Sequence, residues 1–341
     1  MSSSLLLVTS AANGVKLWSY ASPSSNQIKS AGANAPCRLV HAIDKDEAGG
    51  NVNAACWSED GRLLAFTGSD GVVSIYNAES AQLEAIPTEG LRGGIIRRWD
   101  RHERRWLDQL SGHRGTITSM ALDIDQTHLA SVSVSGELLV DNLQKNMQHQ
   151  YTIPTEQALN AVDYSKFRKS LLLCGGDDGA VHIMDTNRSQ TPLKTFHDAH
   201  HAPVKGVAFS PFNRYLMCSA GLDKRVVLYD AEKQGAIKTL TTDQPLTTLA
   251  FKNDGVTIAT GTIQGKLLLF DLRSSSKPLA SVWAHEPHPV KSTAFQNALQ
   301  LRVVEGVIED CLQDFREEIR ADLQNLHLEL LRQFHIQRAI Q

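Results

Sequence analysis

Histidine and aspartate side chains near the middle of the chain could bind a metal ion. His197, Asp198, His200 and His201 stand within five residues, and zinc accepts imidazole and carboxylate ligands. One of them also belongs to a series whose members are 87 and 85 residues apart: His113, His200 and His285. Such spacing indicates one structural position that recurs along the chain, with each imidazole hydrogen-bonded inside its own repeat. We expect this structural role and no metal or cofactor; a zinc site is the alternative.

Carboxylates recur in the same way. Asp70, Asp178 and Asp223 could suggest acid and base groups, but each stands at a turn in front of an apolar segment. Aspartate is favoured there because its side chain hydrogen-bonds nearby backbone. The chain contains no G-x-S-x-G, H-E-x-x-H or phosphate-loop pattern. We therefore expect a protein that is not an enzyme.

A ladder of similar dipeptides indicates the elements that position these residues. Each dipeptide pairs an apolar residue with a small polar one, five or six residues after a turn, and the pairs are Trp18-Ser19, Tyr76-Asn77, Trp99-Asp100, Val140-Asp141, Met184-Asp185, Tyr229-Asp230 and Phe270-Asp271. From Asp100 the second members step by 41, 44, 45 and 41 residues. This period, with a strand that closes on an apolar-Asp pair, is typical of WD40 propeller blades.

A second series of apolar segments predicts the inner strand of each blade: 52–57, 117–122, 159–164, 204–209, 246–251 and 290–295. There are seven closing pairs but six such strands, and no blade follows 290–295. We expect 290–295 to pair with the N-terminal blade and close the ring, because an open propeller exposes strand edges. The alternative is a linker strand.

One blade is short. The inner strands 52–57 and 117–122 start 65 residues apart, whereas two blades need roughly 86 residues by the repeat period. Residues 91–113 read as the outer half of a blade, so about 20 residues are missing from the third blade. We expect an all-β, seven-bladed propeller over residues 1–296 with an incomplete third blade. The alternative is that 78–90 forms a makeshift strand.

The apolar period changes after Phe295. Apolar residues then recur every three or four positions, and the main ones are Leu301, Val304, Ile308, Leu312, Phe315, Ile319, Leu323, Leu326, Leu330 and Phe334. This predicts a long amphipathic α-helix over 297–341, whose apolar stripe a closed propeller cannot cover. We expect the helix to form a homo-oligomer or to bind a partner helix. Packing against the side of the propeller is the alternative.

The bulk composition argues against several classes of protein. The chain has 341 residues and a net charge of −3, which gives no general attraction to nucleic acid or to a membrane surface. Its five cysteines are scattered, with no C-x-x-C pair, as expected of reduced thiols. No signal peptide or transmembrane run is evident. We expect a soluble cytoplasmic protein. Six arginines between 92 and 105 could contact an acidic partner or simply form a solvated strand edge.

Parts of the sequence resemble one family closely: the WD-repeat targeting subunit of the gamma-tubulin ring complex, the GCP-WD family. In the propeller the resemblance is carried by GLDKRVVLYD (221–230), DGVTIATGTIQGKLLLFDLR (254–273) and AHEPHPVKSTAFQ (284–296). In the tail it is carried by DFREEIRADLQNLHLELLRQFHIQ (314–337). The tail segment is the more specific of these, because WD repeats occur in many families.

The resemblance implies a non-catalytic adaptor that recruits gamma-tubulin complexes for microtubule nucleation in cell division. It implies that the propeller directs the protein to spindle, microtubule or centrosomal sites of the cytoskeleton, and that the tail binds the complex and self-associates. The tail residues to which the resemblance assigns partner binding are Phe315, Arg316, Ile319, Leu323, Leu326, Leu330 and Phe334.

This chain departs from the family pattern in its short third blade, in the lack of a long phosphorylatable linker before the tail, and in a tail that stops at Gln341. A second hypothesis is therefore kept: a generic WD40 scaffold or a substrate receptor of a ubiquitin ligase. The tail discriminates the two, since an adaptor needs 314–337 and a receptor needs only the propeller. Binding of RNA or DNA is a weaker third reading.

Overall fold

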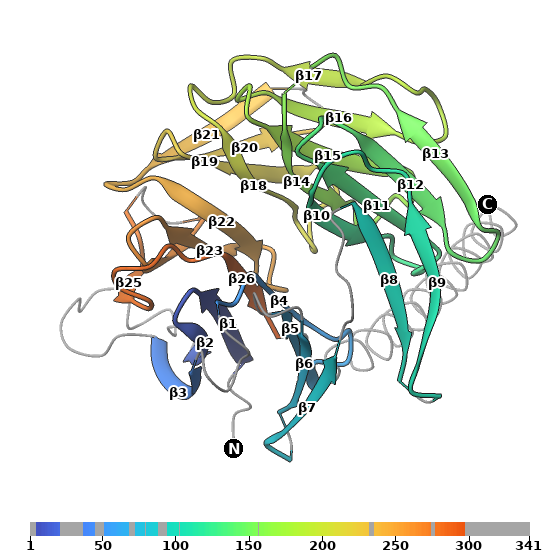
Figure 1. The fold of residues 1–341 in the computed structure, drawn as a ribbon. Helices are drawn as coiled ribbons and strands as arrows, with labels where there is room; N and C mark the ends of the chain where they lie inside the picture. The colour runs from blue at the N-terminus through green and yellow to red at the C-terminus, as the bar shows by residue number, and fades with distance from the viewer. Residues whose placement is uncertain are drawn as a thin grey trace, which may run out of the picture. The chain divides into compact units, whose positions relative to one another are not determined.

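The computed structural model describes residues 5–296 except 21–36, 45–50, 68–71, 79, 88–93, 102, 156, 232–234 and 274–276. The first of the two compact units of the chain, Met1–Ser58 with Arg62–Asn297, contains all the strands named below. The fold is an all-β, seven-bladed propeller (Figure 1).

The sheets follow one another along the chain, apart from the last strand. The first sheet has the order β26 (Ser292–Phe295), β1 (Leu5–Ala11), β2 (Gly14–Tyr20), β3 (Cys37–Asp44). The second contains β4 (Ala54–Trp57), β5 (Leu63–Thr67), β6 (Val72–Asn77) and β7 (Gln82–Pro87), and the third contains β8 (Ile95–Asp100) and β9 (Arg105–Ser111). The fourth contains β10 (Ile117–Leu122), β11 (His128–Ser133), β12 (Leu138–Asn142) and β13 (Met147–Tyr151).

The remaining three sheets have four strands each. The fifth contains β14 (Leu159–Tyr164), β15 (Leu171–Gly176), β16 (Val181–Asp185) and β17 (Lys194–Phe196). The sixth contains β18 (Val204–Phe209), β19 (Leu216–Gly221), β20 (Arg225–Asp230) and β21 (Gly235–Thr241). The seventh contains β22 (Leu246–Phe251), β23 (Thr257–Thr262), β24 (Lys266–Asp271) and β25 (Ala280–Trp283).

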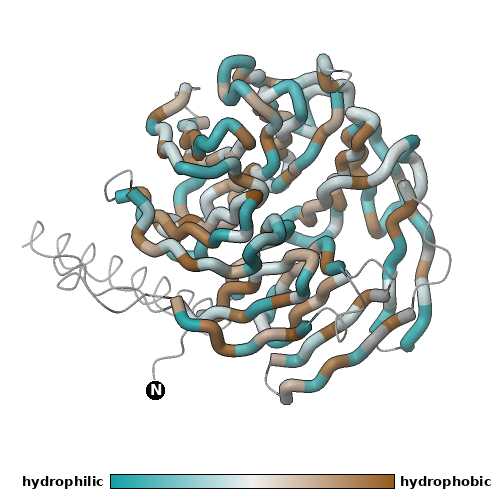
Figure 2. Tube along the Cα trace, turned by 60° about the vertical axis from the view of Figure 1, so that its left-hand side comes forward, coloured by the Kyte–Doolittle hydropathy of each residue, from teal (hydrophilic) through white to brown (hydrophobic). Residues whose placement is uncertain are grey.

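The core lies between neighbouring sheets. Phe209 and Tyr229 of the sixth sheet are buried in one apolar cluster with Leu171 and Leu173 of the fifth. Both faces of the central strands are covered, so β15 and β16 are buried along their whole length. β15 is accordingly a run of apolar and small residues, LLLCGG. Apolar residues follow the strands around the ring in Figure 2. Each large apolar side chain buried in this way contributes roughly 1.5–3 kcal/mol relative to exposure.

The third sheet consists of two strands among the described residues. Arg101, just after β8, forms an ion pair with Glu84 of the second sheet at 3.7 Å. On the other side, Nε2 of Gln148 in the fourth sheet donates to the carbonyl of Ser111 at 3.0 Å. The third sheet thus contacts both of its neighbours. Within 78–90, the alternative source of a strand for this sheet, β7 is instead the fourth strand of the second sheet.

One dipeptide of the predicted ladder is displaced by one residue. Asp141, not Val140, stands opposite Leu129, and Asn142 stands opposite His128. The closing pair of the fourth blade is therefore Asp141-Asn142, and the prediction of Val140-Asp141 was wrong. An aspartate occupies the place that an apolar residue has in the other blades, so the pattern of residue types pointed to the preceding dipeptide.

The last strand closes the ring on the first sheet. β26 pairs antiparallel with β1, with Phe295 opposite Leu7 and Ser292 opposite Ser10. Beyond the ends of the ladder, the amide of Lys291 donates to Ser10 O at 2.7 Å and that of Gln296 to Leu6 O at 2.8 Å. Two segments almost 290 residues apart thus share one sheet, and β1 has a strand on both sides.

A buried polar network stands at this closure. His285 lies just before β26, and its Nδ1 is 2.6 Å from Oδ1 of Asn13 in the turn between β1 and β2. Its Nε2 is 2.9 Å from Oγ1 of Thr9, which also accepts from Nε1 of Trp18 at 2.9 Å. The amide oxygen of Asn13 can only accept, so Nδ1 carries the proton and Nε2 accepts from the Thr9 hydroxyl.

This arrangement requires a neutral imidazole. Burial, with a smaller effect from the Lys16 ammonium, lowers the pKa of His285 to about 4. An unfolded histidine has a pKa of about 6.5. Between these values the unfolded chain holds one more proton at this position than the folded chain does. The contribution of His285 is therefore present above pH 6.5 and is lost as the pH falls towards about 4.

The first prediction concerns pH. We expect the free energy of unfolding of the parent chain to fall between pH 6.5 and about 4, with roughly 3 kcal/mol of the fall due to His285. In His285→Gln this part of the slope is absent. His149 lies on the exposed outer strand β13, so His149→Gln is the matched control and keeps the parental slope. Urea unfolding at several pH values measures all three; parallel curves for His285→Gln and the parent would contradict the assignment.

The second prediction concerns Thr9. Thr9→Val keeps the shape of the side chain but leaves Nε1 of Trp18 and Nε2 of His285 without the hydroxyl between them. Stranding two buried polar groups costs on the order of 2–4 kcal/mol. Thr239 lies on the outer strand β21, where its side chain is exposed, and Thr239→Val should change the unfolding free energy by less than about 0.5 kcal/mol. Equal effects of the two substitutions in urea unfolding would show that the network adds nothing.

Candidate functional site

The histidine predicted at the start of the sixth blade lies in a buried network within that blade. Nδ1 of His200 is 2.8 Å from Oδ1 of Asp223, and its Nε2 is 2.7 Å from Oγ of Ser219. That hydroxyl is 2.8 Å from the phenol oxygen of Tyr229. Burial lowers the pKa of His200 although the Asp223 carboxylate opposes this. The chain of contacts fastens the segment before β18 to the turn and to two strands of the same sheet.

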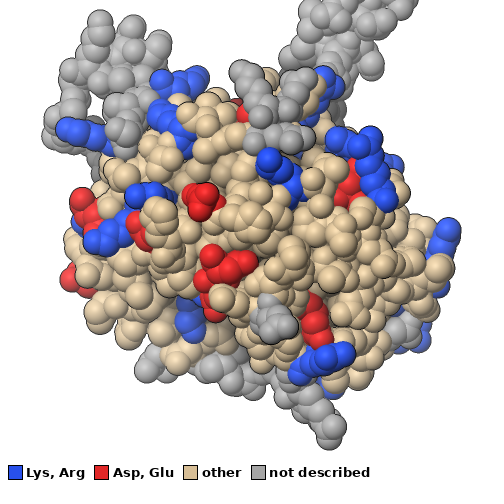
Figure 3. All heavy atoms as spheres, turned by 90° about the horizontal axis from the view of Figure 1, so that it is seen from above, with Lys and Arg blue, Asp and Glu red and all other residues tan. Residues whose placement is uncertain are grey.

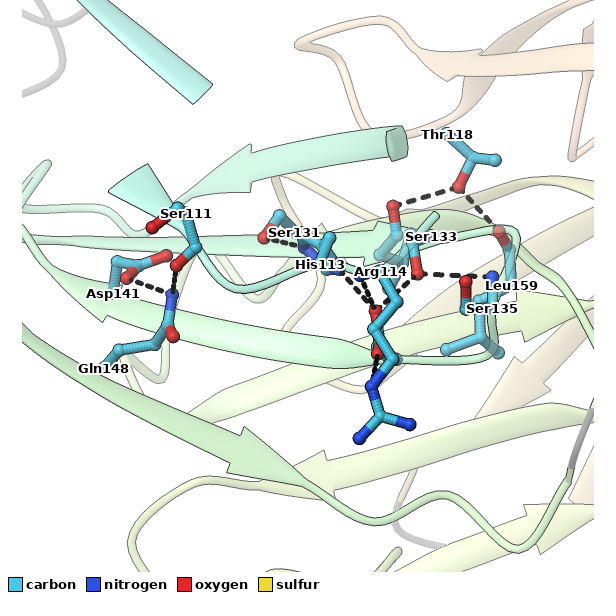
Figure 4. A network of polar contacts seen from close by, with 12 residues as sticks. Ser111, His113, Arg114, Thr118, Ser131, Ser133, Ser135, Asp141, Gln148 and Leu159 are labelled. Atoms are coloured by element: carbon cyan, nitrogen blue, oxygen red, sulfur yellow. Dashed lines mark hydrogen bonds and ion pairs between the residues drawn. The ribbon is translucent and has the colours of Figure 1, made fainter. Parts of the chain in front are cut away.

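The fourth blade has a variant of this network (Figure 4). Nε2 of His113 is 2.7 Å from Oγ of Ser131, and its Nδ1 is 3.4 Å from Glu137. Glu137 also accepts from the amide of Arg114 at 2.9 Å, so it does here what Asp223 does in the sixth blade. Burial lowers the pKa of His113. The sequence predicted both turns but no role for Glu137 or Asn13. Asn13 takes the place of the aspartate, and Glu137 stands two residues after that place, which Ser135 occupies.

Three of the other predicted closing pairs lie at the ends of their strands. Trp99 and Phe270 occupy the apolar position near the ends of β8 and β24, and Tyr229 does so in β20. The aspartate that follows each of them, Asp100, Asp230 or Asp271, is the last residue of its strand. Two of these carboxylates fix the next turn, since Asp100 accepts from the amide of Glu103 at 3.0 Å and Asp271 from that of Arg273 at 2.9 Å.

Other predicted residues have simpler positions or are not described. Asp178 accepts from the amide of Ala180 at 3.0 Å, which is the turn role expected of it. Asp70 lies outside the described residues. All seven predicted partner-binding positions of the tail also lie outside them: Phe315, Arg316, Ile319, Leu323, Leu326, Leu330 and Phe334.

Polar side chains from neighbouring blades meet near the start of the inner strands. In each four-stranded sheet, the second residue of the predicted inner-strand segment is polar. These six residues, which we call the polar ring, are Asn53, Thr118, Asn160, Lys205, Thr247 and Lys291. Several reach the next blade. Oγ1 of Thr118 donates to Leu159 O at 2.6 Å, and Oγ1 of Thr247 donates to Val290 O at 2.6 Å.

The most connected part of this polar ring lies between the fifth and sixth blades. Nδ2 of Asn160 donates to Val204 O at 3.0 Å and to Asp177 at 2.8 Å. Nζ of Lys205 donates to Oδ1 of Asn160 at 2.9 Å and to Asp177 at 3.2 Å. Burial alone would raise the pKa of Asp177, but bonds from Asn160 and Lys205 lower it. The sequence analysis did not use this recurring polar position, although comparison of the inner strands could have found it.

Charges elsewhere are mixed in sign. On the face shown in Figure 3, acidic and basic side chains are interspersed among large uncharged areas. The arginine cluster beside the third sheet is partly compensated, because Arg101 and Arg104 face Glu84 at 3.7 and 4.0 Å and Arg105 pairs with Glu103. These exposed pairs contribute little to stability, but they favour a solvated strand edge over an intensely basic docking patch.

The described side chains do not assemble reactive chemistry. Within that part of the chain, no three His, Cys, Asp or Glu residues are grouped as metal ligands. His200 is buried, whereas His197 and His201 are exposed. Burial raises the pKa of Cys174 and Cys218, so these thiols stay protonated. Over the same residues, no helix is long and apolar enough to span a membrane.

Comparison with known proteins places the chain among WD-repeat propellers. The family described as "Nucleolar protein 10-like, N-terminal domain" matches residues 116–313, and "Anaphase-promoting complex subunit 4 WD40 domain" matches 12–89. Protein NEDD1 of Homo sapiens is 31% identical over 280 residues, which cover 76% of this chain and 42% of that protein. Protein NEDD1 of Mus musculus is 32% identical over 285 residues, which cover 77% and 43%. The chain thus spans less than half the length of these relatives.

A solved structure gives the same fold. A chain in "Crystal Structure of Mitotic Checkpoint Complex" superposes with a TM-score of 0.63 at 20% identity, covering 71% of this chain and 80% of that one. This likeness concerns the propeller architecture. The chain belongs to the β-propeller family described as Nucleolar protein 10-like, N-terminal domain, and the resemblance of its sequence to the GCP-WD family is confirmed by its similarity to Protein NEDD1.

Proposed function

We propose that this chain is a non-catalytic adaptor that recruits gamma-tubulin complexes to spindle, microtubule or centrosomal sites for microtubule nucleation in cell division. The observation that carries the proposal is the similarity to Protein NEDD1, which extends over 76% of the chain. A propeller whose described residues form structural networks and no reactive constellation supports a binding role. The localisation is accordingly the cytoplasm and cytoskeleton.

In this proposal the propeller and the tail have different functions. The propeller, residues 1–296, binds microtubule- or spindle-associated targeting proteins, and the polar ring around Asn160 and Lys205 gives it a rigid, hydrogen-bonding surface. The tail, 297–341, is an amphipathic helix that binds components of the gamma-tubulin ring complex and forms a homo-oligomer. The apolar stripe of the tail, with its three- and four-residue steps, supports a helix with one adhesive face.

We also propose that the third blade is incomplete. We take the third blade to be β8 and β9 alone, with no inner strands. The two-stranded sheet of the described residues and the 65-residue step between the inner strands support this. The contacts that hold β8 and β9 to both neighbours would allow the outer half of the blade to keep its place without an inner half.

The third prediction tests the tail. We expect the full chain to capture gamma-tubulin from a mitotic extract, and Phe315→Ala/Leu326→Ala/Phe334→Ala to lose most of this capture, because three large apolar side chains are removed from one helix face. The matched control carries the same three substitutions at exposed positions of the propeller, Phe167→Ala/Leu193→Ala/Phe212→Ala. Immunoblotting of the captured material for gamma-tubulin measures the effect.

The outcomes separate the two functional hypotheses. Loss in the tail variant with retention in the control supports the adaptor. Capture that survives the tail substitutions but fails in the control places binding on the propeller, as in a generic WD40 scaffold or a ubiquitin-ligase receptor. A parent chain that captures no gamma-tubulin rejects the adaptor proposal for this chain.

A further inference from the structure

In the described residues the third sheet consists of β8 and β9 alone, and one face of the fourth sheet lies open beside it. Met120 and Leu122 lie on β10, opposite Ser131 and Leu129 of β11. They are 53% and 43% exposed. The residues at the position of Met120 in the other five four-stranded sheets are all buried: Ala55, Val162, Val207, Leu249 and Thr293. Tyr164, Phe209 and Phe295, at the position of Leu122, are buried as well.

The difference has a simple cause. Val207 and Phe209 are buried because Leu171 and Leu173 of the preceding sheet pack against them. For Met120 and Leu122 the preceding sheet is the third, and in the described residues it has no strand inside β8. Two large apolar side chains consequently face solvent, where their counterparts form the core.

The second sheet is open on the opposite side of the same space. Ala54 and Cys56 of β4 face the third sheet and are exposed. Their counterparts Ala161 and Ala208, which face the next complete sheet, are buried. Desolvation nevertheless raises the pKa of the exposed Cys56 thiol.

A buried polar atom also lacks its partner here. A Cβ on Gly94 would lie 2.6 Å from the carbonyl of His113, just as one on Gly179 would lie 2.5 Å from that of His200. Trp99 follows Gly94 by five residues, as Met184 follows Gly179, so Trp99 has the position of Trp18 and Tyr229 in its own sheet.

At that position the indole of Trp18 donates to Thr9 on the adjacent inner strand, and the phenol of Tyr229 bonds Ser219. Nε1 of Trp99 is buried and has no hydrogen-bond partner among the described residues. A buried donor left without an acceptor destabilises the fold. The group that would satisfy it is a hydroxyl on a strand beside β8.

The interface to be filled continues one that already exists. Outside the open half, Leu129 and Leu139 on the same face of the fourth sheet are buried. Gly112, just after β9, lies so close that a Cβ there would be 2.9 Å from Leu139. The packed outer half and the open inner half form one continuous surface between the second and fourth sheets.

We propose that this space binds a β-hairpin of a partner protein, which supplies the two inner strands of the third blade. The strand beside β8 carries Ser or Thr two residues along from the position opposite Trp99, just as Thr9 lies two residues from Leu7, which stands opposite Trp18. Its small side chains face Met120 and Leu122, as Ala250 and Ala259 of the seventh sheet face Phe295. The main chain of the hairpin extends the sheet from β8, and its side chains give the specificity. The inference goes beyond the adaptor function and does not depend on it.

The fourth prediction uses a hairpin taken from this chain. The probe is a synthetic peptide of residues 246–262, LTTLAFKNDGVTIATGT, which contains both inner strands of the seventh blade and the hydroxyl of Thr260. On the purified full chain, we expect saturating peptide to slow alkylation of Cys56 at least tenfold, as followed by mass spectrometry. A Thr260→Val peptide needs roughly fivefold more for the same protection. A scrambled peptide gives none.

A variant of the receptor side keeps the test specific. Met120→Asp/Leu122→Asp changes exposed side chains only, so it folds, and its Cys56 reacts at the parental rate without peptide; protection by the peptide is lost. Equal protection by the hairpin and scrambled peptides, or no protection, overturns the proposal. Cys56 protected without peptide also overturns it: protection that disappears on dilution identifies a second copy as the occupant, and protection at every dilution identifies a segment of this chain.

Discussion

Every sheet of this propeller has two apolar faces and can bury neither of them by itself. Except beside the two-stranded third sheet, each face is covered by the neighbouring sheet. The stability of a blade therefore depends on both neighbours, and only a closed ring gives every blade two of them. The pairing of β26 with β1 makes this possible, because it joins the first and last strands in one sheet and leaves β1 without a free edge. The network of His285, Thr9 and Trp18 stands at the same place and is fully buried.

The polar networks stiffen a fold whose cohesion is apolar. The networks of His285, His113 and His200 stand in the first, fourth and sixth sheets, where histidine, hydroxyl and aromatic or carboxylate groups are linked. In the fifth sheet Cys174 and Met184 take the hydroxyl and aromatic places and join an apolar cluster instead. A blade can therefore be held by either means. Both give the fixed backbone on which a binding surface such as the ring around Asn160 and Lys205 can be built.

Much of the fold can be predicted from the sequence, because the propeller repeats one local pattern. Turn, strand and closing pair recur with a nearly constant period, and this alone predicts the sevenfold ring. The pattern fails where a residue departs from type: Asp141 in an apolar position shifted one closing pair, and Asn13 and Glu137 contact the histidines of their blades without the aspartate that marks this role elsewhere. The exposure of Met120 and Leu122 could not be read from their own strand, which resembles the others. It depends on what packs against them from a different part of the chain.

The same limits apply to the site. The histidines His113, His200 and His285 could be assigned to structural networks from their spacing, whereas the hydrogen bonds of Asn160, Lys205 and Asp177 required the geometry of neighbouring blades. The tail residues are named by pattern and resemblance, and their role rests on the proposed function.

Native-state hydrogen exchange on the full chain tests the ring account most directly. If mutual covering of sheet faces controls stability, the amides of β1 and β26 exchange only through global unfolding, as slowly as those of β18 and β19. The amides of β10, next to the open half of the third sheet, exchange faster than their counterparts in β14 and β18. Exchange of β26 and β1 well before β18, with β10 as protected as β14, would contradict the account.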